Sequence, residues 1–307
     1  MNPIHLLAVL HVACAIVFAP LLPGIISRTK AIFAGRQGPP LLQGYFDLAK
    51  LLRKGAVYSE STTWLFRAGP IIGLSAACVA LLLVPFAGVR AIAAFPGDLI
   101  LVAYLLGLMR FFTVLAALDT ASSFEGMGAS REVTFSALAE PALLLGLAAL
   151  ARRSGGFSLS EGYSAVRLFD FGPTGGLPLL LIGAALFVVY LAENARIPFD
   201  DPNTHLELTM IHEVMVLDHG GPDLALVQYA GAIKLWILGA LVVGILLPIR
   251  TGHLALDFAV GLAAMGALAV ATGCVESTMA RLRLNRVPQL LVAATVLSAL
   301  ALMLVLR

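Results

Sequence analysis

The chain has 307 residues, of which 60% are hydrophobic and only 12% are charged, and its formal net charge is +2. A soluble globular chain carries about 25% charged residues. This composition, with a mean hydropathy of +0.95, therefore excludes a soluble enzyme and a disordered chain. The small net charge supplies no basic field to attract a polyanion, so nucleic-acid binding is excluded as well. The chain requires a bilayer as solvent, and we expect an all-α integral membrane protein.

Apolar stretches long enough to cross a bilayer recur along the whole chain. A helix needs about 20 apolar residues to span the hydrocarbon core, and backbone groups in lipid must bond internally, which favours helices over strands. Eight stretches meet this length, at residues 3–25, 69–88, 97–118, 134–152, 177–195, 226–248, 254–274 and 289–306. The first has no basic residue before it, unlike a signal peptide, so we expect it to be retained. We expect eight transmembrane helices in a single transmembrane domain over residues 1–307.

Lysine and arginine residues are distributed unevenly between the two sides of these spans. With the N-terminus outside, the inner loops hold twelve basic residues and the outer segments six, whereas Arg110 and Lys234 lie within spans. Basic residues accumulate on the cytoplasmic side of membrane proteins. The ratio predicts that the N and C termini both lie outside, in a multi-pass protein of the cell inner (cytoplasmic) membrane.

Two inner loops, residues 26–68 and 196–225, are long and carry amphipathic segments. In the first, four apolar residues lie among charged ones, namely Phe46, Leu48, Leu51 and Leu52. In the second, four apolar residues recur at spacings of three and four, namely Leu206, Met210, Val214 and Leu217. These patterns predict an amphipathic helix in each loop, the first lying at the membrane surface.

The three cysteines, Cys14, Cys78 and Cys274, lie in separate apolar runs. A tetrahedral metal site or an iron–sulfur cluster needs about four clustered ligands. We therefore interpret the cysteines as small buried hydrophobic residues. We expect neither a metal centre nor a disulfide framework in this chain.

Ionisable residues inside the predicted spans are costly, so each indicates a functional site. At 1.5 Å per residue, Glu140 lies about 9 Å from the inner end of its span, and Arg110 and Lys234 lie about 12 Å from theirs. Glu193 lies about 3 Å from the inner end of its span, and Glu276 lies at the inner edge. Most of the charge within the spans therefore gathers in the inner half of the membrane.

The outer half offers only Asp98 and Asp257, close to the surface. The pattern predicts half of an ion path, open to the inside and blocked above. Buried carboxyls on such a path take up and release protons. Alternatively, the cations within the spans only neutralise the carboxylates in static pairs. Pro141 directly follows Glu140, and a proline inside a helix predicts a kink with room for water.

Five stretches of the sequence together resemble one family. They are GRQGPPLLQGYFDLAKLL (35–52), ALDTASSFEGMGASRE (117–132), AEPALLLG (139–146), AENARIPFDDPNTHLEL (192–208) and ESTMARLRLNRVP (276–288). The ENxRxPFD pattern at 193–200 is the most specific of them. Over nearly its whole length the chain resembles the first membrane subunit of respiratory complex I. The second and fifth stretches resemble the branch of membrane-bound nickel–iron hydrogenases, which includes formate hydrogenlyase subunit 4 and hydrogenase-4 component C.

The resemblance implies positions for an acidic route toward antiporter-like subunits. Glu140, Glu193, Asp200 and Glu207 match acids that line this route in the family, and Arg196 matches the arginine of ENxRxPFD. The residues expected on the proton path are Glu140, Glu193, Asp200, Asp201, His205, Glu207, Glu213, Asp218 and Glu276. Their expected charge partners are Arg110, Arg196 and Lys234.

The loop that follows PFD departs from the family pattern. Asn203 and His205 occupy positions where the family usually has acids, whereas Asp201 adds one. Asp218 retains, in a shorter side chain, the acid of the family's EYSG motif. Because a histidine also carries a proton near neutral pH, the departure predicts a rewired route or a weaker coupling to the redox site.

The resemblance also implies that loops 26–68 and 196–225 dock a soluble peripheral arm. The residues expected at this docking surface are Arg36, Asp47, Lys50, Asp119, Arg131, Glu132, Arg281 and Arg283. The implied partners are hydrogenase-type large and small subunits, iron–sulfur subunits and antiporter-like membrane subunits. Iron–sulfur clusters and a nickel–iron site are expected in those partners, with no cofactor in this chain. The chain itself is then a non-catalytic subunit that anchors the arm and couples electron flow to ion movement.

Three alternatives remain open from the sequence. The chain could be the quinone-binding subunit of NADH-quinone oxidoreductase, with a lipid-accessible quinone tunnel under the inner loops. It could be a stand-alone ion transporter, which would transport ions by itself in liposomes. It could also be a purely structural anchor, with every buried charge permanently paired.

Overall fold

The computed structural model describes residues 3–167, 176–200, 210–248 and 250–307. The regular structure of these residues is helical, apart from an isolated bridge between Phe86 and Val89. The long helices are α1 Pro3–Phe18, α2 Leu21–Phe33, α4 Trp64–Leu83, α5 Asp98–Asp119, α6 Ser123–Ser154, α8 Gly176–Glu193, α9 Gly221–Leu246, α10 Leu254–Thr278 and α11 Val287–Leu306. The shorter ones are α3 Gln43–Leu52, α7 Leu159–Ser164 and the 3-10 helix η1 Glu213–Val216. The all-α prediction is confirmed.

The predicted number of spans is also confirmed. Within the described residues, seven helices are long and apolar enough to cross a membrane, and the bent pair α1–α2 supplies an eighth. The largest difference from the sequence prediction is α6, which begins at Ser123 rather than at residue 134 and runs for 32 residues. Its first turns carry charged residues and lack the apolar run on which the prediction rested.

The first span is bent by 51° between α1 and α2, so the prediction of an unbroken span over residues 3–25 is wrong. Pro20 lies at the break and has no N–H to donate to the carbonyl of Ile16. The hydroxyl of Tyr229 donates to this carbonyl at 2.9 Å, and the hydroxyl of Tyr45 donates to the carbonyl of Val17. Side chains from two other helices therefore replace the helical hydrogen bonds that the break removes.

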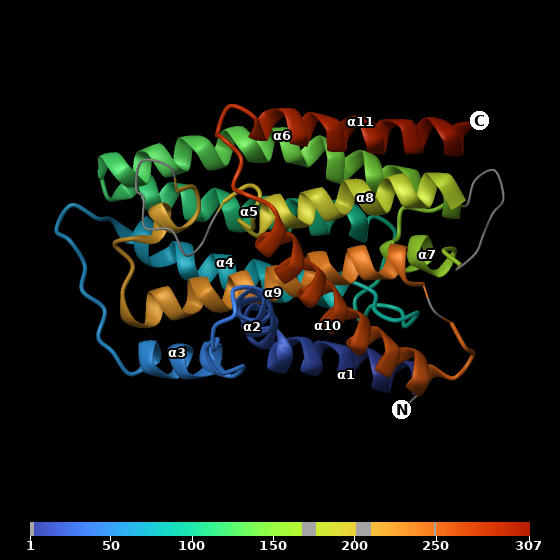
Figure 1. Cartoon of the computed structure of the whole chain (residues 1–307), viewed down its shortest axis with the longest axis horizontal. Coiled ribbons are helices and arrows are strands. Elements are labelled where there is room, and N and C mark those ends of the chain that lie inside the picture. The colour runs from blue at the N-terminus through green and yellow to red at the C-terminus, as the bar shows by residue number, and fades with distance from the viewer. Residues whose placement is uncertain (1–2, 168–175, 201–209, 249) are drawn as a thin grey trace.

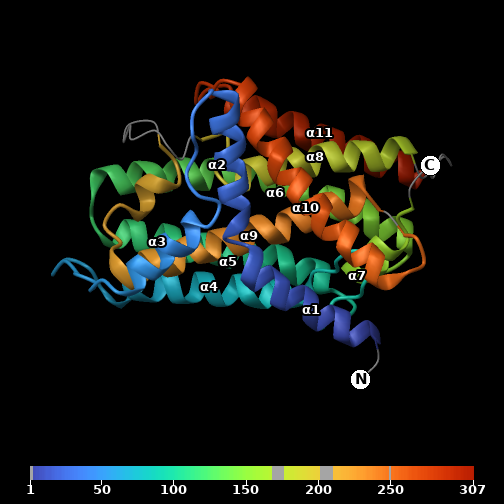
Figure 2. The ribbon, with the colours of Figure 1, turned by 60° about the horizontal axis from the view of Figure 1, so that its bottom comes forward.

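Helix α9 lies at the centre of the bundle. In its most apolar stretch 78% of the residues are buried, compared with 28% in α11. It packs against α4, α8 and α10, while α11 packs against α6 and α8. Figure 1 shows most spans running along the long axis with α10 crossing them obliquely, and Figure 2 shows α2 crossing the bundle on the same side as α10.

The two termini lie at the same end of the bundle, as predicted (Figure 1). This end also holds α7 and the connection between α9 and α10, and the opposite end holds α3 (Figure 1). We call these the outer and the inner end, following the distribution of basic residues. Helix α7 had no counterpart in the sequence prediction.

The two predicted amphipathic helices have different outcomes. Helix α3 forms in the first inner loop as expected. In the second loop, the described residues before the start of α9 at Gly221 contain only the single turn of η1, in which Val214 is buried, whereas Leu217 beyond it is 51% exposed. The expected apolar stripe is therefore wrong in this part, and Leu206 lies outside the described residues. The carboxylate of Asp200 accepts the backbone N–H groups of Ile211 and His212. These two N–H groups therefore cannot form the hydrogen bonds that a continuous helix through this segment would require.

Candidate functional site

Arg110 is the centre of a charged cluster inside the bundle. It lies on α5 and donates from Nη1 to Glu140 and from Nη2 to Glu193, each at 2.6 Å. Its Nε lies 3.6 Å from a carboxylate oxygen of Glu132. Glu132 and Glu140 lie on α6, and Glu193 ends α8. Because a guanidinium presents its donors as a planar fork, one arginine joins three carboxylates from two helices.

Lys234 on α9 adds a second cation, with Nζ 3.1 Å from the other carboxylate oxygen of Glu193. We call Arg110, Glu132, Glu140, Glu193 and Lys234 the central cluster. It combines three carboxylates with two cations, so the fully ionised cluster carries one excess negative charge. An excess negative charge taken out of water favours the uptake of a proton.

Glu140 differs from the other members of the central cluster in its exposure. Its side chain is 49% exposed, whereas those of Arg110 and Glu193 are 10% and 5% exposed. The carboxylate therefore lies at the surface of the bundle within a membrane-spanning helix. Helix α6 continues through Pro141, so the expected kink does not interrupt the helix.

A pocket of about 270 Å³ connects the central cluster to the inner loops. Glu132 and Asp200 line it, together with apolar residues that include Phe135, Phe199 and Ile211. It has polar groups on both sides and room for about one water molecule, which is what a buried water requires. The pocket therefore links a carboxylate of the cluster to a carboxylate of the ENxRxPFD segment.

Asp200 has a structural role as well. Its side chain is 3% exposed, and Oδ1 lies 2.9 Å from a guanidinium nitrogen of Arg281. Its Oδ2 accepts the backbone N–H groups of Ile211 and His212 at 2.9 and 3.2 Å. These contacts fasten the second inner loop to the segment after α10, so Arg281, which was expected at the docking surface, has a partner within the chain.

His212 lies next to this segment, before η1. Burial lowers the pKa of His212 to about 4, and the positive charge of Lys234 lowers it further, against the opposing effect of Asp200 and Glu193. The imidazole is therefore neutral at pH 7, with one ring nitrogen able to donate and the other able to accept.

Glu276 is the centre of a second buried group of ion pairs. Its side chain has no exposed surface, and Oε2 lies 2.8 Å from Nζ of Lys30 on α2. Its Oε1 lies 3.6 Å from a guanidinium nitrogen of Arg196. The sequence indicated that Arg196 and Glu276 belong to the charged path. It did not indicate Lys30, because Lys30 lies in a segment that was assigned to a loop.

Two further expected acids lie near the inner end of α6. Glu213 lies in η1, and Asp218 is exposed but donates its backbone N–H to Glu125 at 3.0 Å. Glu125, which the sequence analysis missed, is fully buried and also accepts the hydroxyl of Thr120. The remaining expected acids and histidine, Asp201, His205 and Glu207, lie outside the described residues.

The residues expected at the docking surface fall into two groups. Arg36, Lys50 and Arg283 are exposed at the inner end. The others have partners within the chain: Asp47 accepts from Gln43, Asp119 accepts from the backbone of Thr63, Arg131 donates to the carbonyl of Met210, and Glu132 belongs to the central cluster. The first group is therefore the more accessible of the two.

The part of the chain that the structure describes holds no group of three or more histidine, cysteine, aspartate or glutamate residues that could bind a metal ion. The central cluster instead mixes carboxylates with cations at hydrogen-bond distance.

Comparison with known proteins identifies the family. The family model described as NADH dehydrogenase matches residues 5–307. Formate hydrogenlyase subunit 4 of Escherichia coli (strain K12) is 30% identical over 278 residues, which cover 89% of each chain. Hydrogenase-4 component C of the same organism is 34% identical over 234 residues, covering 76% of this chain and 72% of that protein.

A solved structure shares the fold. It is described as the membrane-bound sulfane sulfur reductase, an archaeal respiratory membrane complex, and one of its chains matches with a TM-score of 0.82 and 24% identity, covering 98% of this chain and 99% of that chain. These findings confirm the resemblance that the sequence motifs indicated, including the two hydrogenase-type relatives. The chain belongs to the NADH dehydrogenase family, as a multi-span membrane protein similar to subunits of hydrogenase-type and respiratory complexes.

Proposed function

We propose that the chain is the membrane-anchoring and proton-coupling subunit of a complex I-like membrane-bound hydrogenase. In this function it connects a soluble electron-transfer arm to ion-pumping, antiporter-like membrane subunits in the inner (cytoplasmic) membrane. The observation that carries the proposal is the central cluster, in which three carboxylates share two cations inside the bundle.

The fully ionised central cluster carries one excess negative charge, so it can take up one proton. Two unit charges 4 Å apart interact by about 4 kcal/mol at an effective dielectric constant near 20, which corresponds to about three pKa units. A change of one charge at that distance is therefore large enough to move a proton between neighbouring carboxylates of the cluster. The mechanism is electrostatic, and it requires no cofactor in this chain.

The proposal assigns this proton an entry and an exit. The pocket between Asp200 and Glu132 opens the central cluster to the inner loops. Arg110 then joins Glu132 to Glu140, whose side chain is 49% exposed. A half-exposed carboxylate inside a membrane is costly in lipid, which supports a polar partner subunit against this face of α6. An antiporter-like membrane subunit meets this requirement.

The inner end supports the anchoring role. Exposed basic residues there, including Arg36, Lys50 and Arg283, lie with exposed apolar residues of α3 such as Phe46 and Leu52. Mixed apolar and charged surfaces of this kind are suited to protein contacts. The iron–sulfur clusters and the nickel–iron site that such a hydrogenase needs would belong to the partner subunits.

The test is Glu140→Gln in the assembled complex, with hydrogen turnover and proton movement measured in membrane vesicles. Glutamine keeps the size of the side chain and its hydrogen bond from Arg110 but holds no exchangeable carboxyl proton, so proton movement per hydrogen turned over should fall severalfold. Glu60→Gln, at an exposed position of the first inner loop, is the matched control and should leave both quantities unchanged. If Glu140→Gln also leaves both unchanged, the coupling role is wrong and the chain is a structural anchor.

A second measurement separates the proposal from stand-alone transport. The purified chain alone, reconstituted in liposomes, should move no ions, because the exposed carboxylate of Glu140 has no partner there to receive the proton. Ion movement by the chain alone would contradict the proposal. Co-purification of a nickel–iron large subunit would support the hydrogenase branch.

A further inference from the structure

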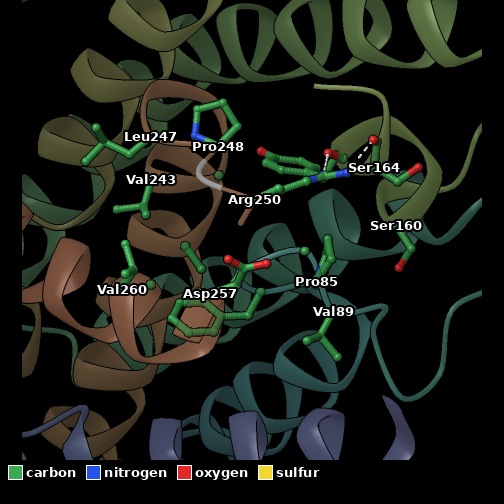
Figure 3. A pocket seen from close by; sticks show the side chains of 17 residues that line it. Pro85, Val89, Ser160, Ser164, Val243, Leu247, Pro248, Arg250, Asp257 and Val260 are labelled. Carbon is green, nitrogen blue, oxygen red and sulfur yellow. Dashed lines mark hydrogen bonds between the residues drawn. The ribbon is translucent and has the colours of Figure 1, made fainter. Parts of the chain in front are cut away.

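A second, larger pocket lies at the outer end of the bundle, away from the central cluster. It lies between residues 85–89, α7, the end of α9 and the start of α10, and its space of about 560 Å³ is partly open to solvent. Figure 3 shows Arg250 and Asp257 facing it from the connection between α9 and α10 and from the first turn of α10. No residue of the expected proton path lines this pocket.

The two charged residues of the pocket are held in place by different partners. Arg250 donates from Nη1 to the carbonyl of Ser164 at 2.6 Å and from Nη2 to the carbonyl of Tyr163, which fixes it against the end of α7 (Figure 3). Asp257, which is 6% exposed, accepts the N–H and the hydroxyl of Thr251 at 2.8 and 2.7 Å. Each charge therefore has a fixed position.

Both residues retain unused binding capacity. A guanidinium has five N–H donors, and a carboxylate has about four lone-pair sites. Arg250 and Asp257 form no ion pair with each other among the contacts of the described residues, although both line one pocket. An acceptor for Arg250 and a donor for Asp257 can therefore bind side by side.

Ser160 and Ser164 of α7 also line the pocket, and much of its remaining wall is apolar and belongs to the ends of membrane spans. Phe86, Val243 and Val260 line it, as does Leu247, which is also 44% exposed. Further exposed leucines flank the connection between α9 and α10, namely Leu246, Leu254 and Leu256. Exposed leucines beside a span end indicate contact with lipid. The pocket therefore lies at the depth where headgroups meet acyl chains.

Glycines allow the walls to approach each other. A Cβ atom at Gly244 would lie 2.6 Å from the ring of Tyr163, and one at Gly261 would lie 2.7 Å from the Cβ of Ala87. Both are closer than real Cβ contacts, so any larger residue at these positions would push α7 or residues 85–89 away. The pocket is thus shaped by close backbone packing, not by loosely placed loops.

We propose that this outer pocket binds the headgroup of a zwitterionic phospholipid that carries a primary ammonium group. The phosphate lies against Arg250, because arginine pairs well with phosphate oxygens. The ammonium group donates to Asp257, and the first methylenes of the acyl chains lie along Leu247 and Val260. A headgroup without a cation lacks the partner for Asp257, and a trimethylated headgroup has no N–H to donate.

The test is lipid binding to the purified full chain in detergent, measured by native mass spectrometry. The probes are phosphatidylethanolamine, phosphatidylcholine and phosphatidylglycerol with identical acyl chains. The wild-type chain should bind phosphatidylethanolamine on the order of tenfold more tightly than either other lipid, as one charge-assisted hydrogen bond would produce. Equal binding of the three lipids by the wild-type chain would overturn the proposal without any variant.

Two variants locate the preference in this pocket. Asp257→Asn keeps the size of the side chain and an acceptor for Thr251, and it should reduce phosphatidylethanolamine binding to the level of the other two lipids. Arg90→Gln, which changes an exposed basic residue of the outer end that does not line the pocket, should keep the preference. A preference that survives Asp257→Asn, or that Arg90→Gln abolishes, would place the lipid elsewhere and contradict the assignment.

Discussion

Buried carboxylates have different partners in the two halves of this molecule. At the outer end, Asp98 accepts a backbone N–H from Leu159 at 2.6 Å and the hydroxyl of Ser158 at 3.0 Å. At the inner end, Glu193 lies between Arg110 and Lys234, at 2.6 and 3.1 Å. The outer carboxylate is bonded to neutral dipoles, and the inner one is bonded to cations that other carboxylates share.

This difference separates structural acids from acids suited to coupling. A backbone N–H group stays in place and carries no net charge, so it stabilises one ionised carboxylate and responds to nothing else. A shared cation divides its interaction among several acids, so a change at one acid alters the proton affinity of the next. Asp98 therefore fastens a loop, and the carboxylates around Arg110 form a network that can respond to charge. Asp200 and Glu125, although they lie at the inner end, also accept backbone N–H groups and fasten loops.

The largest expected effect is that of Arg110→Met, which removes the cation that joins Glu132, Glu140 and Glu193. Breaking a buried charge network by removing one partner costs about 3–5 kcal/mol, so the free energy of unfolding in detergent should fall by that amount. Arg110→Lys is the control, because it keeps the positive charge and should cost clearly less. A loss equal in both variants would mean that side-chain packing, and not charge, holds the cluster.

Asp98→Ala is expected to have the next largest effect, and it tests the structural half of the comparison. It leaves the N–H of Leu159 and the hydroxyl of Ser158 without an acceptor in a site with no exposed surface. Unpaired buried polar groups cost about 1–3 kcal/mol, measurable as a lower unfolding midpoint. Proton movement in the assembled complex should stay unchanged. A loss of coupling at normal hydrogen turnover would show that the outer half also carries protons.

Gly128→Ala has a smaller expected effect and tests how the inner loop is held against α6. A Cβ atom at Gly128 would lie 2.2 Å from Val214 and 3.0 Å from the carbonyl of Ile211, and overpacking of this kind costs about 1–3 kcal/mol. Gly126→Ala on the same helix is the control, since nothing lies within 4 Å of its Cβ. That variant should be neutral or stabilising by about 0.5–1 kcal/mol. Equal effects would mean that η1 is not seated on α6.

The sequence could predict the spans and the depth of the main charges, because both follow from hydropathy and from the rise of a helix. Glu140, Arg110 and Lys234 were expected in the inner half, and they meet there around Glu193. The break at Pro20 was missed because hydropathy continues across it, and the tyrosines that satisfy the freed carbonyls are distant in sequence.

Two partners of the charged groups could not be predicted, for a shared reason. Glu132 and Lys30 lie in segments that are too polar to be assigned as spans, although both segments are helical. Their contacts with Arg110 and Glu276 depend on how α6 and α2 extend past the apolar stretch. Hydropathy locates the part of a helix that lies in lipid, but it does not locate the helical ends where this network is completed.

A further expected effect, on the pH dependence of stability, concerns His212, whose folded pKa of about 4 lies below the ordinary value of 6.5, through burial first and the charge of Lys234 second. As the pH falls, the unfolded chain therefore binds a proton at this site before the folded chain does. The contribution is fully present above about pH 7 and is lost as the pH falls from about 6.5 toward 4. His212→Gln should make the unfolding midpoint in detergent less sensitive to acid over this interval, whereas the exposed His253→Gln should not. If both variants kept the acid sensitivity of the wild type, the neutral imidazole of His212 would not contribute to the stability of the inner loop. The residues of this loop that matter for the charged network would then extend no further than Asp200.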